Sequence, residues 1–212
     1  MNSSSTFLPT GTVYGTLLNF RAEREALATQ MTQPPYKAPP RAPVLYVKTA
    51  NTWSPHGSEI AVPKNVADVE VGASVGMVIG EAGSVAGYVL MNDLSIPHAS
   101  FFRPPVKFKC IDGFLGVGPG MRDARDLPDP AAVRAHVRID GELRHTIDFS
   151  QLVRPAAQLL ADVSEFMTLA PGDVLMLGCD LGRPLARAGA RIDISAPGFA
   201  TLSNTLAQEA PQ

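Results

Sequence analysis

The chain has 212 residues, of which 45% are hydrophobic, and its formal net charge is -2. This apolar content is enough for a buried core and excludes a wholly disordered chain, while the balanced charge excludes a strongly basic nucleic-acid binder. Eighteen glycines and nineteen prolines favour a β-rich fold with many turns, and the length is that of one domain.

Cellular context is indicated by three features. Two cysteines, Cys110 and Cys179, are too few for a disulfide scaffold or a zinc cluster. The first basic residue is Arg21, unlike the basic start of a signal peptide, and the least charged run, 71–80, is too short to cross a bilayer. We therefore expect a cytoplasmic protein without nucleic-acid or membrane partners.

The hydrophobic pattern predicts mostly strands. Apolar residues alternate with polar ones over 133–139, which is the period of a strand with one solvated face, and Asp140-Gly141 is typical of a hairpin turn. Five prolines within 32–43 indicate a stiff extended loop. In chain order we expect strands at 13–19, 44–48, 71–79, 86–91, 133–139, 142–149, 174–177 and around 192–194, with helices at 22–31 and 155–168.

Helix 155–168 has the clearest amphipathic pattern, because five apolar side chains fall on one face: Leu159, Leu160, Val163, Phe166 and Met167. With at least eight strands against two or three helices, we predict a β-rich α+β domain. Residues 1–11 are expected to form a loose N-terminal segment, 12–207 the domain and 208–212 a tail.

Common catalytic motifs are weak here. GVGPGM at 116–121 resembles a phosphate loop, but Pro119 interrupts it, so a tight loop is favoured. The chain has no G-x-S-x-G elbow of a serine hydrolase. His136 and His145 fit surface positions, whereas His98 lies five residues after Asp93 and is the better functional candidate.

Segment 92–119 has the highest density of candidate site residues. It places six charged or titratable side chains between apolar segments: Asp93, His98, Arg103, Lys107, Lys109 and Asp112. Such groups must be solvated or paired, so an ordinary surface loop is one interpretation. The other is an anion site, in which lysine and arginine hold carboxylates and an aspartate reaches a cation.

Five ordered blocks resemble the fumarylacetoacetate hydrolase superfamily. Within it, the chain is most similar to the isomerase/decarboxylases of 4-hydroxyphenylacetate (homoprotocatechuate) degradation, and specifically to their N-terminal half or separate N-terminal subunit. The blocks are 34–52, 72–80, 85–114, 163–178 and 197–206. The resemblance implies a mixed β-roll with a few short helices, and a homodimer or a heterodimer with a homologous subunit. It also implies a divalent cation (Mg²⁺, Mn²⁺ or Ca²⁺) that chelates a 2-oxo acid and stabilises an enolate.

The resemblance assigns site residues position by position. Lys109 matches the lysine that stabilises the oxyanion, and Lys48 matches a second substrate-binding lysine. Asp93 matches one metal ligand, but Gly72 and Ser74 stand where the family has two glutamates. A single carboxylate is a poor magnesium site, so a metal is doubtful in this chain.

Other family positions also differ. Glu23 stands where the family has a histidine in its lid segment. Pro97-His98 stands where the family has an arginine that binds the substrate. Cys179 lies in the family's substrate-binding loop. We therefore expect Lys109, Asp93 and His98 to be the catalytic residues. The substrate-binding residues are expected to be Lys48, Arg103, Lys107 and Cys179.

The resemblance implies a function in aromatic acid catabolism. The expected reaction is decarboxylation of 5-oxopent-3-ene-1,2,5-tricarboxylate and isomerisation of its product, 2-hydroxyhepta-2,4-diene-1,7-dioate, through one dienolate. One alternative is a non-catalytic subunit that pairs with a homologous, metal-bearing subunit. A further alternative, an acylpyruvate-type hydrolase, is disfavoured because hydrolysis needs a base at the position of the missing lid histidine.

Overall fold

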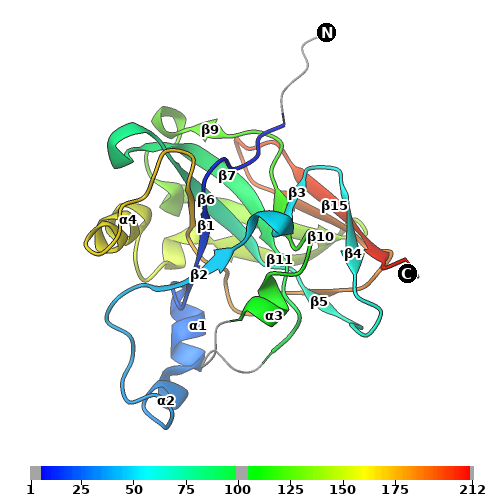
Figure 1. Cartoon of the computed structure of the whole chain (residues 1–212), viewed down its shortest axis with the longest axis horizontal. Coiled ribbons are helices and arrows are strands. Elements are labelled where there is room, and N and C mark those ends of the chain that lie inside the picture. Colours follow the sequence, from blue (N-terminus) through cyan, green and yellow to red (C-terminus); the bar gives the residue numbers. More distant parts are fainter. Residues whose placement is uncertain (1–5, 99–104, 211–212) are drawn as a thin grey trace.

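The computed structural model describes residues 6–98 and 105–210, and strands predominate in it (Figure 1). Its largest sheet has eight strands in the order β2-β1-β12-β6-β7-β8-β3, with β9 paired to β7. The bounds are β1 (Val13–Leu17), β2 (Val44–Lys48), β3 (Trp53–Pro55), β6 (Ala73–Ile79), β7 (Val85–Asp93), β8 (Leu115–Val117), β9 (Arg122–Asp123) and β12 (Val174–Met176). The β-rich fold expected from the sequence is confirmed.

A second sheet has five strands in the order β11-β10-β14-β15-β4, and β13 pairs with β5 in a small third sheet. The bounds are β4 (Glu59–Val62), β5 (Val69–Glu70), β10 (Arg134–Ile139), β11 (Glu142–Asp148), β13 (Leu185–Ala186), β14 (Arg191–Ser195) and β15 (Leu202–Gln208). The hairpin between β10 and β11 turns at Asp140-Gly141, both with positive φ, as the sequence predicts.

Helices are short and lie outside the sheets (Figure 1). They are α1 (Arg21–Ala26), α2 (Ala28–Met31), α3 (Val106–Lys109) and α4 (Ala156–Ser164). Single 3₁₀ turns occupy Ala50–Thr52, Glu81–Gly83, Ala124–Asp126, Pro130–Ala132 and Phe149–Gln151. Among the described residues, no helix is long and apolar enough to cross a membrane.

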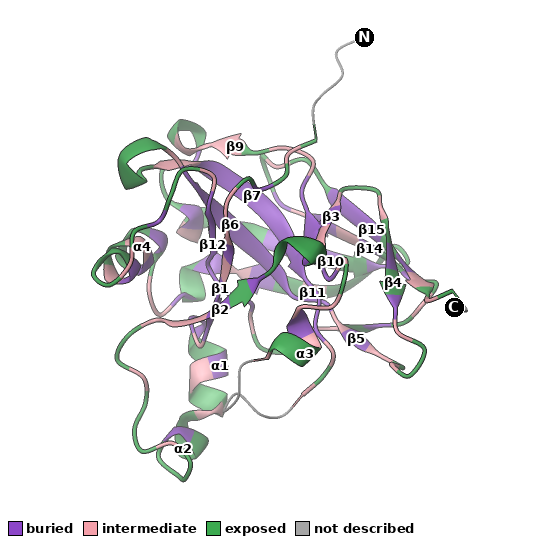
Figure 2. Cartoon of the chain, viewed as in Figure 1, coloured by how far each residue is buried: buried purple, intermediate pink, exposed green. Residues whose placement is uncertain are grey.

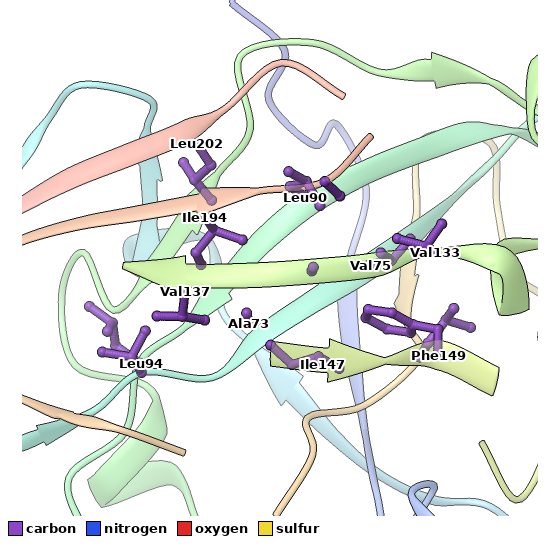
Figure 3. Packing of buried hydrophobic residues seen from close by; sticks show 14 of the residues in the cluster. Ala73, Val75, Leu90, Leu94, Val133, Val137, Ile147, Phe149, Ile194 and Leu202 are labelled. Carbon is purple, nitrogen blue, oxygen red and sulfur yellow. The ribbon is translucent and has the colours of Figure 1, made fainter. Parts of the chain in front are cut away.

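The main core lies between the two large sheets. Ala73 and Val75 of β6 and Leu90 of β7 face Val137 of β10 and Ile194 of β14 (Figure 3). Every residue of β6 is buried (Figure 2). The reason is that a second apolar cluster packs on the other face of the same sheet. Burial on both faces explains why the sequence of β6 is apolar without alternation.

Several sequence-based assignments differ from the structure. The helix expected at 22–31 breaks at Leu27, and the helix expected at 155–168 ends at Ser164, which leaves Phe166 57% exposed. The strand expected at 71–79 begins only at Ala73, because the amide of Val71 donates to Pro184 O. GVGPGM is only partly a loop, since Gly116 and Val117 belong to β8.

Candidate functional site

Three chain segments end at one buried point of the fold. Asp93 is the last residue of β7, Lys48 the last of β2 and Lys109 the last of α3. Their exposed fractions are only 1%, 0% and 2%, and Tyr46 of β2 lies beside them. Charged groups as deeply buried as these require close partners, and here they provide them for one another.

Both oxygens of the Asp93 carboxylate lie against ammonium groups. Its Oδ1 lies 2.9 Å from Lys48 Nζ and its Oδ2 lies 2.7 Å from Lys109 Nζ. The hydroxyl of Tyr46 also donates to Oδ2. Burial alone would raise the pKa of Asp93, but the two ammonium groups and these hydrogen bonds hold that pKa far below its usual range. Asp93 is therefore a permanently ionised partner and not a base.

Lys48 connects the same three segments through the backbone. Besides Asp93, its ammonium donates to Leu94 O at 3.2 Å, to Phe114 O at 2.7 Å and to Lys109 O. An ammonium has three N–H donors, and four oxygens surround this one. Burial lowers the pKa of Lys48, although Asp93 opposes that shift. With no donor left over, Lys48 fixes the centre from within.

The residues present do not fit a divalent metal. A Cβ at Gly72 would lie 2.5 Å from Asp93 O and 2.9 Å from Cys179 Sγ, so the position has no room for a carboxylate side chain. Ser74 spends its hydroxyl on Gly178 O at 2.7 Å. Within 6–98 and 105–210, no three His, Cys, Asp or Glu side chains form a group that could hold a metal ion.

Cys179 is a buried thiol at the edge of this centre. Its Sγ lies 3.9 Å from Asp93 Oδ2. Burial, with Asp93 nearby, raises the pKa of Cys179 to about 12. The group therefore remains a thiol at neutral pH and is not a nucleophile. Its volume fills the space beside Gly72.

A second charged group lies between α1 and the segment around Arg183. Glu23 of α1 is 3% exposed and accepts a hydrogen bond from the amide of Leu18 at 2.8 Å through Oε2. Its other oxygen, Oε1, has no hydrogen-bond partner within the described part of the chain and lies 3.9 Å from Arg183 Nη2. Arg183 Nε lies 3.4 Å from Glu70 Oε2. Burial raises the pKa of Glu23, and Arg183 and Lys109 oppose that shift.

The other candidate residues lie outside the buried centre. The ring of His98 stacks on Phe108 of α3 with centroids 4.7 Å apart, and its Nδ1 lies 2.8 Å from Ile96 O. Lys107 is exposed on α3, and Asp112 accepts from Asn51 at 2.6 Å. Arg103 lies outside the described residues.

Sequence reasoning brought Asp93, Lys48, Lys109 and Cys179 together, as the structure does. It missed Tyr46, which precedes Lys48 by two residues and so lies on the same face of its strand. It also missed the pairing of Glu23 with Arg183, which are 160 residues apart, and no sequence pattern connects these two side chains.

Comparisons with known proteins agree with the resemblance. The family model described as fumarylacetoacetate (FAA) hydrolase C-terminal matches residues 12–207. The 4-hydroxyphenylacetate degradation bifunctional isomerase/decarboxylases of Salmonella dublin and Escherichia coli are 37% and 35% identical over 209 residues, covering 94% of this chain and 48% of each relative. The chain thus spans about half the length of these curated relatives.

Solved structures show the same fold. Fumarylpyruvate hydrolase from Pseudomonas aeruginosa, in complex with Mn²⁺ and pyruvate, aligns with a TM-score of 0.79 at 22% identity, covering 99% of this chain and 94% of that chain. 5-carboxymethyl-2-hydroxymuconate delta-isomerase from Mycobacterium smegmatis aligns with a TM-score of 0.73 at 23% identity, covering 94% and 80%. At these identities the likeness concerns the fold alone.

Proposed function

The chain belongs to the fumarylacetoacetate hydrolase family, and from that premise we propose that it is one half of an isomerase/decarboxylase of aromatic acid breakdown. The proposed substrates are 5-oxopent-3-ene-1,2,5-tricarboxylate and its decarboxylated product, 2-hydroxyhepta-2,4-diene-1,7-dioate. The support is the identity to bifunctional isomerase/decarboxylases, of which this chain matches about half. A homologous, metal-bearing subunit or a second copy is the proposed partner.

The engaged carboxylate of Asp93 supports a role without a bound metal. Both of its oxygens face ammonium groups, and Gly72 has no space for a further carboxylate. The loss of CO₂ next to a 2-oxo acid needs an electron sink for the developing enolate. We assign that step to the partner and not to this half.

The charges of the cluster also favour this assignment. Two cations, Lys48 and Lys109, pair with Asp93. In the second charged group, Arg183 faces Glu23 and Glu70. A site for a tricarboxylate needs an excess of positive charge, and over the two groups together three cations face three carboxylates. We therefore propose a structural role for the buried ion pairs: they hold the ends of β2, β7 and α3 together through Lys48, Asp93 and Lys109.

The proposal is tested by supplying the missing half. The chain is purified alone and mixed with the half of the Salmonella dublin relative that it does not span, and CO₂ release from the tricarboxylate is measured with Mg²⁺ present. We expect release only from the mixture, together with a complex detected by light scattering. Release by the chain alone, abolished by Asp93→Asn, would show that this half carries the decarboxylation itself.

A further inference from the structure

An apolar cavity of about 140 Å³ lies between the end of β1, the helix α2 and the loop that leads to β2. The helices α1 and α2 and this loop project together from the sheets (Figure 1). Leu17, Met31 and Val44 line the cavity from β1, α2 and β2, and the first two of these side chains are buried. Of the described residues that line it, none carries a charge.

The cavity is distinct from the buried centre at Asp93. Val44 and Lys48 are the two ends of β2. About 13 Å of extended strand separates them, since each of the four residues advances the chain by roughly 3.3 Å. The lining includes neither Lys48 nor Asp93 nor Lys109. The roles proposed above therefore leave this cavity without a function.

The volume of the cavity limits the size of its ligand. An apolar cavity of about 150 Å³ stays dry and takes up one benzene ring. Gln30 and Tyr36 add the only polar side-chain groups among the described lining residues, and such a lining is typical of sites for small, mostly apolar molecules. A single ring therefore fits. An open-chain tricarboxylate does not, because its charges would be desolvated without partners.

The charges around the cavity favour an anionic group on that ring. Segment 26–44 supplies most of the wall, and it contains Lys37 and Arg41 but no acidic residue. Both cations are exposed; Lys37 lies between two lining residues, and Arg41 follows a third. Long cationic side chains can keep their stems on an apolar surface while their charged ends reach an anion in water. A carboxylate at the rim therefore has complementary charge on the wall of the cavity itself.

We propose that this cavity binds a monocyclic aromatic carboxylate, with the ring inside the cavity and the carboxylate at the rim beside Lys37 and Arg41. A ring in this position contacts β1, α2 and the loop to β2 at once, so its binding holds these segments together. The binding itself does not depend on the proposed function. Only its physiological meaning, as recognition of an acid whose ring is still closed, rests on the proposed role in aromatic acid breakdown.

The test is a calorimetric titration of phenylacetate into the purified full chain, for which we expect saturable binding of one molecule per chain. Ala38 is an exposed lining residue, and Ala38→Leu should raise Kd about tenfold or more, because the larger side chain takes space from the ring. Ala42→Leu is the matched control, since Ala42 is exposed on the same loop but is not a lining residue, and it should bind as the unchanged chain does. The melting temperature of each variant shows whether it is folded.

Three further probes separate the ring from the charge. Benzyl alcohol has the ring without the carboxylate and should bind about 2–5-fold more weakly than phenylacetate, as expected for the loss of an exposed ion pair. Acetate has the carboxylate without the ring and should give no saturable heat, and 4-biphenylacetate should not fit because it carries a second ring. Lys37→Gln should reduce the preference for phenylacetate over benzyl alcohol, whereas Lys64→Gln, at an exposed lysine after β4, should leave it unchanged.

Several results would overturn the proposal. They are the absence of saturable heat with phenylacetate, an unchanged Kd in folded Ala38→Leu, and binding of 4-biphenylacetate as tight as that of phenylacetate. Equal affinities for benzyl alcohol and phenylacetate would overturn the role of the carboxylate. Displacement of phenylacetate by the added half of the Salmonella dublin relative would show that a protein partner occupies the cavity, which also contradicts the proposal.

Failure of this inference and failure of the proposed function are distinguishable. The titration uses the chain alone, without the partner half, the tricarboxylate or a metal ion. A chain that does not bind phenylacetate but supports CO₂ release in the mixture overturns the cavity site alone. A chain that binds phenylacetate but gives an inactive mixture overturns the proposed function alone.

Discussion

Replacing Lys48 by methionine tests how much the buried ion pairs contribute to stability. The substitution keeps the length of the side chain but leaves Asp93 Oδ1 and three carbonyl oxygens, of Leu94, Lys109 and Phe114, without their common donor. Breaking a buried pair by removing one partner costs about 3–5 kcal/mol. At about 2–4 °C per kcal/mol for a chain of this length, the melting temperature should fall by about 6–20 °C.

The assay is urea unfolding at neutral pH, followed by circular dichroism. Arg134→Met is the matched control, because Arg134 pairs with Asp148 at 3.2 Å with 70% of its side chain exposed, and such a pair contributes at most about 1 kcal/mol. If Lys48→Met lost less than about 1 kcal/mol, the buried network would not stabilise the centre as argued.

Three further predictions concern single side chains. The folded state raises the pKa of Glu23, so this group favours folding most below its ordinary pKa and loses that contribution as pH rises through the folded value. Urea unfolding measures the free energy of unfolding of Glu23→Gln and of the unchanged chain at pH 4.5 and at pH 8. The difference, variant minus unchanged chain, should be more favourable to the variant at pH 8 than at pH 4.5. A difference independent of pH would contradict this. Gly72→Ala should lose about 1–3 kcal/mol in the same assay, because its Cβ would lie 2.5 Å from Asp93 O, and an unchanged midpoint would refute the steric argument. Iodoacetamide at pH 8 should label the half-buried Cys110 and spare Cys179, whose pKa is about 12; equal labelling of the folded chain would show that Cys179 is accessible.

The fold was largely predictable because its strands carry local signals. Alternation over 133–139 and the Asp140-Gly141 turn lie within one hairpin, so neighbouring residues determine them. The break near Gly72 was not predictable, because Val71 donates to Pro184, far along the chain. Boundaries of this kind depend on tertiary hydrogen bonds, which no local window contains.

The candidate site was predictable only in part, for the same reason. Lys109 and Asp93 lie within one charged segment, and their family match brought Lys48 with them. Glu23, by contrast, drew attention only as a departure from the family pattern. Its burial and its pairing with Arg183 arise from the fold, so no local sequence pattern contains them.

We propose that the ammonium groups of Lys48 and Lys109 take the place of a metal ion at the carboxylate of Asp93. Titration of Mn²⁺ into the purified chain, followed by the electron paramagnetic resonance of the free ion, tests this claim most directly. We predict no saturable binding up to millimolar concentrations and the same trace for Asp93→Asn. Stoichiometric uptake of Mn²⁺ that Asp93→Asn abolishes would contradict the claim.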